Sequence, residues 1–533
     1  MGKRAVALFF VFCLILATEV LHLGTVAVGE YHSSAQIKSS KCYELSCERA
    51  PIYDCRGERL TNEKTSYYAA IKPTAQALLS IENMFSDKEL LEIHQRLKNF
   101  KPVIKKVDYP NFKSEDVSIF SKNERYSDNQ ILSHTIGYIN SDGEGVTGIE
   151  KGFNELFKNN IQRTKILFPC DANGKVLSGA KITQEVENAF GKSGVYITID
   201  KRIQEIAEQC MDEGHIDVGA MVVIEPSTGK IKAMVSRPNF NPDDIAKSLN
   251  EINSPLLNRA LCAFSVGSVF KPAIAACALE QNISPYIMYN CTGKEKVKDV
   301  SFSCYNGNSH GKINMCGAIE QSCNCYFINL IEKMDMEETL STLKAFGFGK
   351  ETVLCDSLIS KSGVLPTLEE LDTPAAKANF SFGQGNFLAT PLQISAYMSA
   401  IANGGILNEP YLIEKTVDKN IVSFEHEKIK GKRVLNKKTA DLIKSFLQSA
   451  VENGNGRGAR LFNTTSAGKT ATAQTGNFKD GKELYNTWFS GFFPVENPRY
   501  VVTVIKENGS LGASDCAPVF KMLADKINSA EEK

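Results

Sequence analysis

A serine and a lysine three residues apart could carry nucleophilic chemistry. In "SVGSVFKP", Ser268 precedes Lys271 by three positions, so on a helix the two side chains share a face. A serine hydroxyl becomes a good nucleophile when a base removes its proton, and an amine can be that base only when neutral. Lowering a lysine pKa from about 10.4 to near 7 takes roughly 4–5 kcal/mol of burial or like-charge repulsion. The apolar neighbours of Lys271 are expected to supply part of this.

The Ser-x-x-Lys pattern alone is weak evidence, because the chain contains six matches, beginning at residues 178, 227, 268, 309, 341 and 466. Ser268 differs from the other five in the motifs that lie downstream of it. Ser322-Cys323-Asn324 comes next, at the end or start of a helix, and Lys469-Thr470-Ala471 comes after a glycine in a strand-like segment. This fixed order favours one site built from three segments.

The three segments resemble the S-x-x-K, S-x-N and K-T/S-G signatures of the penicillin-binding transpeptidases. Other blocks are similar to class B members: "IYDCRGERL" to the start of their pedestal, and His134–Phe157 to the segment before their catalytic domain. "FSFGQGNFLATPLQISAYMSAIANGG" and "NTWFSGFFP" also look like family blocks. The resemblance to class B penicillin-binding proteins extends from Arg49 to the C-terminus.

This resemblance implies a catalytic role for each matching residue. Ser268 would attack the carbonyl between the last two D-alanines of a peptidoglycan stem peptide, and Lys271 would take its proton. Ser322 would relay a proton to the departing D-alanine. Asn324 would hold Lys271 and the substrate amide. An amine from a second stem peptide would then take the acyl group and form the cross-link, with D,D-carboxypeptidase activity as a side reaction.

The resemblance also implies a binding role for the third segment. Lys469 and Thr470 would bind the terminal carboxylate of the substrate, and the charge of Lys469 would help to keep Lys271 neutral. The backbone N–H groups of Ser268 and Thr472 would form an oxyanion hole, a pair of dipoles aimed at the tetrahedral intermediate.

Two positions depart from the family pattern. Val266 stands where proline is usual, which we expect to matter little. Ala471 replaces the glycine of K-T-G. On a strand, residues 469 and 471 face the same way, so the methyl is predicted to narrow the cleft and weaken β-lactam binding. It removes no catalytic group.

The elements that must position these residues can be predicted from hydrophobic periodicity. A strand at 195–200 is followed by a helix and by two strands that turn at 226–229; a second strand pair turns at 496–498, and a helix closes the chain. Strand pairs that enclose a helical middle predict an α+β domain at 192–533 with an antiparallel sheet and a helical subdomain. The resemblance implies a serine β-lactamase-like transpeptidase fold, preceded by an elongated pedestal at 29–191.

The N-terminus has the composition of a membrane segment. Ala5–Ala27 is almost wholly apolar and would span roughly 34 Å as a helix. Lys3 and Arg4 precede it and favour a cytosolic N-terminus. We predict that residues 1–28 are a single-pass anchor in the cytoplasmic membrane, with the catalytic body outside. The alternative is a cleaved signal peptide, because the uninterrupted apolar part is short.

Charge and cysteine usage limit the partners. The 61 basic and 61 acidic residues balance, which argues against nucleic acid as the main partner. Among the 15 cysteines, a group around Asn324 suggests a zinc site, but it contains no C-x-x-C pair. Free, mostly buried thiols are therefore the favoured interpretation, and we predict neither a metal nor a cofactor. The group comprises Cys291, Cys304, Cys316, Cys323, Cys325 and His310.

Three further landmarks have structural interpretations. Gly383–Gly385 is typical of a tight turn, with substrate contact as the alternative. Trp488, the only tryptophan, lies in an alternating strand and is expected in the core. Asp54 and Arg56 are expected to form an ion pair or a turn.

The leading functional hypothesis is a peptidoglycan D,D-transpeptidase that is inhibited covalently by β-lactams. A separate glycosyltransferase partner is expected, because no glycosyltransferase-like region precedes residue 192. Two alternatives remain open: a β-lactamase or β-lactam sensor, and a non-catalytic scaffold of the wall-synthesis complex.

Overall fold

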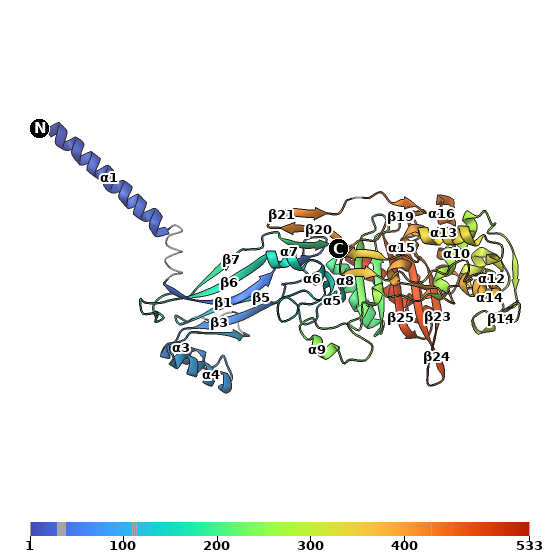
Figure 1. Ribbon diagram of the computed structural model, residues 1–533, viewed down its shortest axis with the longest axis horizontal. Helices are drawn as coiled ribbons and strands as arrows, with labels where there is room; N and C mark the ends of the chain where they lie inside the picture. Colours follow the sequence, from blue (N-terminus) through green and yellow to red (C-terminus); the bar gives the residue numbers. More distant parts are fainter. Residues whose placement is uncertain are drawn as a thin grey trace. The chain divides into compact units, whose positions relative to one another are not determined.

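A five-stranded antiparallel sheet forms the centre of the C-terminal part of the protein (Figure 1). The structure is a computed structural model that describes residues 2–28, 39–108, 110, 112, 114–427 and 429–531. These residues form two compact units, one of 1–50, 61–127 and 158–192 and the other of 51–60, 128–157 and 193–533.

The central sheet has the strand order β10-β9-β25-β24-β23, with every neighbouring pair antiparallel. The mixed helix-and-sheet fold predicted from the sequence is therefore confirmed. β23 is the edge strand, so one side of its backbone is not paired within the sheet. The strands are β9 (Gly219–Ile224), β10 (Ile231–Arg237), β23 (Ala467–Lys479), β24 (Lys482–Phe493) and β25 (Tyr500–Gly509).

Two helices share a hydrophobic core with this sheet. α8 (Lys201–Glu213) is amphipathic and starts at Asp200, whose carboxylate accepts a hydrogen bond from the backbone N–H of Arg202 at 3.2 Å. α18 (Ala517–Glu531) packs beside it, and both bury apolar side chains against residues such as Val223 and Phe489. Because side chains alternate along a strand, Trp488 projects from the other side of β24.

The middle of the chain is helical, as the sequence indicated. α10 (Lys271–Glu280) is buried for most of its length and packs against several of the others. α15 (Pro391–Ala402) is buried throughout and packs against β9, β24 and β25. The helices that pack against α10 are α11 (Met315–Glu320), α12 (Asn324–Ile331), α13 (Met336–Ala345) and α16 (Lys437–Glu452), while α14 (Pro374–Ser381) packs against α12.

The C-terminal unit also contains two segments that the sequence analysis assigned to the pedestal. β2 (Ile52–Tyr53) pairs in parallel with β8 (Gly194–Ile197), in a sheet completed by β20 (Ile413–Asp418) and β21 (Ile421–Glu425). Residues 128–157, which contain α5 (Ser133–Ile136) and α6 (Gly148–Gly152), join the same unit. In this segment the backbone N–H of Leu132 donates to Glu208 at 3.0 Å. The expected continuous pedestal at 29–191 is thus interrupted twice, because these segments bury themselves against residues far along the chain.

The N-terminal unit has two small antiparallel sheets. In the first, β6 (Ile161–Pro169) lies between β1 (Ser40–Arg49) and β7 (Thr183–Glu187). In the second, β3 (Thr65–Ile71) lies between β4 (Val103–Val107) and β5 (Val117–Asn123), and its core includes residues from α3 (Ala75–Ile81) and α4 (Asp87–Lys98).

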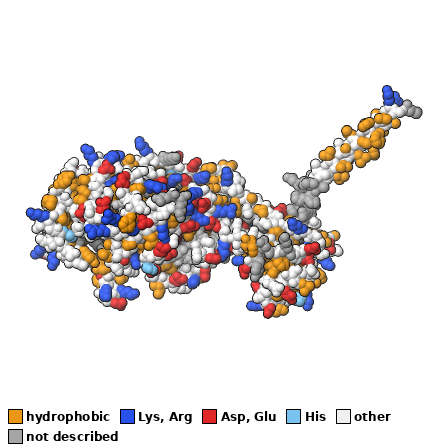
Figure 2. Space-filling model, turned by 180° about the vertical axis from the view of Figure 1, so that it is seen from behind, with side chains coloured by type: hydrophobic (Ala, Val, Ile, Leu, Met, Phe, Trp, Pro, Cys, Tyr) orange, Lys and Arg blue, Asp and Glu red, His pale blue; other side chains and the backbone are white. Residues whose placement is uncertain are grey.

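The predicted N-terminal helix is present as α1 (Gly2–Val28). Within the described residues it is the one helix long and apolar enough to cross a membrane, and none of its most apolar window is buried in the protein. Figure 2 shows hydrophobic side chains around α1 and basic side chains at its tip, where the sequence has Lys3 and Arg4. These features fit a membrane segment and equally a signal peptide.

Candidate active site

Ser268 lies in a 3-10 turn, η2 (Gly267–Phe270), immediately before α10. In a helix that began at Ser268, Pro272 would be an irregularity. The α-helix instead begins at Lys271, so Pro272 occupies its first turn, where a backbone N–H has no intrahelical partner to lose. Ser268 is half-buried.

Gly267 allows the turn to pack tightly. Its φ of +64° is left-handed, a conformation that favours glycine. A methyl group at position 267 would lie 3.1 Å from Cβ of Ala473, so β23 approaches the turn closely at this glycine. The N–H of Gly267 donates to the carbonyl of Gly383 at 2.8 Å. The turn at residues 383–385 thus supports the nucleophile segment, as the structural interpretation expected.

A second support was not predicted from the sequence. The hydroxyl of Tyr397, buried on α15, donates to the backbone carbonyl of Val269 in η2. A buried tyrosine in an apolar helix does not indicate its hydrogen-bond partner. That partner can be identified only when the packing of the helix is known.

Lys271 connects the first two sequence motifs. Its side chain is buried, and its Nζ donates to the carbonyl oxygen of Ser322 at 2.6 Å, to Ser322 Oγ at 3.2 Å and to Oδ1 of Asn324 at 2.7 Å. Ser322 has a φ of +55°, an uncommon conformation for a residue with a side chain, and Asn324 begins α12. The fold therefore brings S-x-x-K and S-x-N together.

The expected hydrogen bond between Ser268 and Lys271 is not formed among the described residues. An ammonium group has three N–H donors and no acceptor, and three acceptors already surround Nζ. Once Lys271 is neutral it has two donors and a lone pair, which could accept the proton of the Ser268 hydroxyl. Catalytic hydrogen bonds are often loose before substrate binds, so the geometry suits a resting state.

Burial lowers the pKa of Lys271 to about 8, although the nearby thiols of Cys323, Cys304 and Cys325 act in the opposite direction. The pKa of Lys469 also lies well below its ordinary value, first because of burial and second because of the charge of Lys271. The sequence analysis expected the charge of Lys469 to keep Lys271 neutral. In the structure, burial lowers the pKa of Lys271, and the repulsion between the two amines lowers the pKa of Lys469.

The third motif lies in β23, at the edge of the central sheet. Lys469 is buried, and its Nζ donates to the carbonyl of Thr470 at 3.1 Å. Thr470 and Thr472 alternate with Lys469 and therefore project to the other side of the strand. The hydroxyl of Thr472 accepts the N–H of Gly512 at 3.2 Å.

Ala471 faces the nucleophile turn. It is 4% exposed, and its Cβ would lie 3.5 Å from a methyl group placed at position 267. The methyl group of Ala471 thus lies beside the turn that contains Ser268. That this methyl group narrows the substrate cleft stays a prediction. Its cross-strand partner Trp488 is buried, with Nε1 donating to the carbonyl of Ser265 at 3.0 Å, so the expected core role of the tryptophan is confirmed.

Asp54 and Arg56 have structural roles. Oδ1 of Asp54 accepts the N–H groups of Arg56 and Glu58, each at 2.8 Å, which forms the expected turn. Arg56 makes its ion pair with Asp200 at 2.7 Å, at the start of α8.

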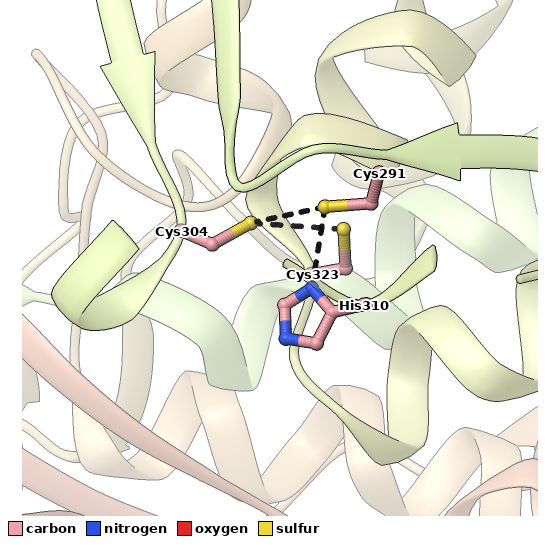
Figure 3. A group of neighbouring side chains, drawn as sticks. All are labelled: Cys291, Cys304, His310 and Cys323. Atoms are coloured by element: carbon pink, nitrogen blue, oxygen red, sulfur yellow. Dashed lines mark hydrogen bonds between the residues drawn. The ribbon is translucent and has the colours of Figure 1, made fainter. Parts of the chain in front are cut away.

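The sequence analysis expected free, mostly buried thiols, and the cysteines are free. It did not predict that Cys291, Cys304, His310 and Cys323 lie together (Figure 3), with the sulfur of Cys325 at 3.5 Å from that of Cys304. Cys316, which the sequence analysis had included, instead approaches Glu320 at 3.3 Å. Loops bring the other members of the group together, and no local spacing rule describes such loops.

Comparison with known proteins agrees with this geometry. Residues 219–525 match the family model described as the penicillin-binding protein transpeptidase domain. Stage V sporulation protein D of Bacillus subtilis is 29% identical over 95% of this chain and 82% of its own length. The peptidoglycan D,D-transpeptidase MrdA of Acinetobacter baumannii is 26% identical over 96% of this chain and 85% of its own.

A solved structure shares the fold. Penicillin-binding protein 3 of Mycobacterium tuberculosis, determined in complex with aztreonam, has a TM-score of 0.66 and 21% identity, covering 91% of this chain and 97% of its own. The family match covers more than half of the chain, and the curated relatives cover nearly all of it. The chain therefore belongs to the penicillin-binding protein transpeptidase family.

Proposed function

We propose that this chain is a peptidoglycan D,D-transpeptidase that cross-links stem peptides through an acyl-enzyme at Ser268. The observation that carries the proposal is the hydrogen-bonded group of Lys271, Ser322 and Asn324. Lys271 directly follows the turn that contains Ser268. A buried amine with a pKa near neutrality is the base that such a serine requires.

The first half of the reaction forms the acyl-enzyme. Neutral Lys271 takes the proton of the Ser268 hydroxyl while Oγ bonds to the carbonyl carbon between the two D-alanines. The N–H groups of Ser268 and Thr472 stabilise the oxyanion that forms. When the C–N bond breaks, the proton passes from Lys271 through Ser322 to the nitrogen of the leaving D-alanine. The second D-alanine departs as a free amino acid.

The second half transfers the acyl group. An amine of another stem peptide attacks the ester carbonyl and loses a proton by the reverse route, so Ser268 and Lys271 return to their starting states. Lys469 and Thr470 bind the carboxylate of the first substrate, and Asn324 orients Lys271 and the substrate amide. Attack by water in place of the amine gives the D,D-carboxypeptidase side reaction. β-Lactams enter the same first step and remain bound as esters of Ser268.

The proposal extends to location and partners. α1 acts as a single-pass anchor in the cytoplasmic membrane, with the catalytic unit on its outer side, because the basic residues Lys3 and Arg4 precede the apolar run. A separate glycosyltransferase supplies the glycan strands.

The test is acylation of the full chain, purified in detergent, by a fluorescent penicillin. We expect a stable adduct whose mass maps to the peptide that contains Ser268, no adduct in Ser268→Ala, and unchanged labelling in Ser227→Ala, a matched serine of another Ser-x-x-Lys match. Release of D-alanine from a stem peptide should require the same serine. Rapid hydrolysis of the penicillin would instead identify a β-lactamase, and labelling that survives Ser268→Ala would refute the assignment.

A further inference from the structure

The turn that contains Ser268 includes one backbone carbonyl whose usual donor is missing. In a 3-10 turn such as η2, each carbonyl accepts the N–H three residues along the chain, and the N–H of Lys271 donates in this way to the carbonyl of Ser268. The next bond of this series would join the carbonyl of Val269 to the N–H of residue 272. That residue is a proline, which has no N–H. The carbonyl of Val269 therefore lacks its 3-10 donor.

The hydroxyl of Tyr397 occupies the place of this donor. It comes from α15, 128 residues further along the chain, and donates to the carbonyl oxygen of Val269. Val269 directly follows Ser268, so the hydrogen bond acts one residue away from the proposed nucleophile. Tyr397 and Val269 are both 0% exposed, so water is not available to replace the hydroxyl.

Aromatic rings lie close to both residues of this hydrogen bond. The centroid of the Tyr397 ring lies 5.9 Å from that of Phe346 and 5.5 Å from that of Phe348. The ring of Phe270, the residue after Val269, has its centroid 5.7 Å from that of the same Phe348. In such apolar surroundings a hydrogen bond is strong and its loss is costly. Burial also raises the pKa of Tyr397, so the hydroxyl keeps its proton and remains a donor.

The two serine hydroxyls of α15 have a different kind of partner. Oγ of Ser395 donates to the carbonyl of Pro391 at 2.9 Å, and Oγ of Ser399 donates to the carbonyl of Ser395 at 2.7 Å. Both serines are buried, and both bonds stay within the helix. The bond of Tyr397 instead leaves α15 and ends at the nucleophile turn. It therefore connects a buried helix to the backbone that carries Ser268.

We propose that Tyr397 is a positioning residue for Ser268, because its hydroxyl takes the place of the N–H that Pro272 lacks. This inference rests on the proposed function, in which Ser268 is the nucleophile. A fixed carbonyl at Val269 keeps the peptide unit after it from rotating, so η2 retains its 3-10 form. The side chain of Ser268 then projects from a backbone of fixed direction. Tyr397 itself is buried below the turn and takes no part in the transfer of protons.

Removal of this hydroxyl should slow the chemical step without weakening the binding of substrate. In Tyr397→Phe the carbonyl of Val269 loses its donor and the turn can shift, whereas Lys469 and Thr470 on β23 keep their places. We expect the first-order rate of acylation in the bound complex to fall roughly 10-fold and the dissociation constant of penicillin to change less than about twofold. A small displacement of a reacting group has an effect of this kind.

The test determines these two constants separately, by stopped-flow acylation of the full chain in detergent with a fluorescent penicillin. Ser395→Ala is the matched control, because it removes one buried hydroxyl from the same helix and should leave both constants unchanged. A purely structural role of Tyr397 would lower the melting temperature of the variant without slowing the acylation of its folded molecules. An unchanged acylation rate in Tyr397→Phe, or an equal decrease in Ser395→Ala, would overturn the proposal.

A second variant tests the relation to the proline. Pro272→Ala restores an N–H three residues after Val269, which can donate to its carbonyl in place of the hydroxyl. The double variant Tyr397→Phe/Pro272→Ala should therefore be acylated at least about threefold faster than Tyr397→Phe. A double variant that is no faster would contradict the claim that the hydroxyl replaces this N–H.

Hydrogen exchange tests the same bond without any use of acylation. Mass spectrometry should detect faster amide exchange in the peptide that contains residues 264–271 in Tyr397→Phe than in the wild type, with no such change in Ser395→Ala. Equal exchange in the wild type and Tyr397→Phe would refute the role of Tyr397 even if no form of the protein were acylated. Faster exchange in Tyr397→Phe, together with a wild type that is not acylated, would support the bond to η2 and refute the proposed function alone.

Discussion

At the scale of single residues, the proposed mechanism depends on the protonation of two buried amines. The pKa of Lys271 is lowered to about 8, so at lower pH most of it is charged and cannot accept the proton of Ser268. The acylation rate should therefore rise as the pH rises toward 8, being about tenfold lower at pH 7 than at its maximum. The pKa of Lys469 is also lowered, first by burial and second by the charge of Lys271, so Lys469 loses its charge more readily than an ordinary lysine. If it is still charged where Lys271 becomes neutral, its own loss of charge should produce a falling limb.

The pH profile is measured as the second-order rate constant of acylation by a fluorescent penicillin between pH 6 and 9.5. Lys469→Arg is the informative variant, because a guanidinium keeps its charge throughout this range. It should retain the rising limb and lose the falling one, even if the overall rate is lower. A rate that does not change between pH 6 and 8 would contradict the role of Lys271 as the base.

The sequence predicted part of the site, but not all of its contacts. The order of the three motifs favoured Ser268 among six similar serines, and the fold brings the first two motifs together. Lys271 makes the expected contact with Asn324, but its contacts with Ser322 were not predicted. The cysteine group was named in the sequence analysis, but the proximity of its members was not predicted, because loops bring Cys291 and Cys323 together and periodicity carries no information about how loops close.

At the scale of elements, the nucleophile segment is held in place by a glycine turn. Gly383 has a φ of +80°, and a methyl group there would lie 2.3 Å from the carbonyl oxygen of Gly267. Gly385 has a similar φ of +78°, but a methyl group at that position would meet only Cβ of Asn379, at 3.4 Å. Both alanine variants would carry backbone strain of about 1 kcal/mol, and only Gly383→Ala would displace the turn of Ser268.

We therefore expect Gly383→Ala to lower the acylation rate by at least about 10-fold and Gly385→Ala by less than about threefold. The melting temperatures of the two variants are the control. If they are similar, slower acylation of Gly383→Ala results from local displacement and not from general unfolding. Equal acylation rates in the two variants would show that the contact between Gly383 and Gly267 does not position the nucleophile.

The elements themselves were predicted best where their periodicity is strong. The strands β9, β10, β24 and β25 and the final helix were expected because apolar side chains alternate or recur regularly there. The start of α10 is not evident from the sequence, since the segment from Val266 to Phe270 does not distinguish a 3-10 turn from an α-helix. Only the backbone geometry makes Lys271 the first residue of the helix.

At the scale of the whole molecule, the chain does not divide at a single point. The pattern of strands and helices suggested a boundary near residue 192, yet residues 51–60 and 128–157 belong to the C-terminal unit. Pairings between residues far apart in sequence decide this, such as Ile52 with Val195 in the parallel pair β2–β8. A single sequence contains no local sign of such pairings, so the division was not predictable from composition.

This division predicts that the transpeptidase region cannot be shortened to residues 193–531 without loss of stability. Removal of the two N-terminal segments would expose β8, leave Glu208 without the N–H of Leu132, and separate Arg56 from its ion pair with Asp200. Compared with residues 39–531, which lack only α1 and the segment after it, the shorter chain should melt at least about 5 °C lower. Its acylation by penicillin should decline in parallel. Equal melting temperatures for the two chains would mean that residues 51–60 and 128–157 contribute little to the stability of the C-terminal unit.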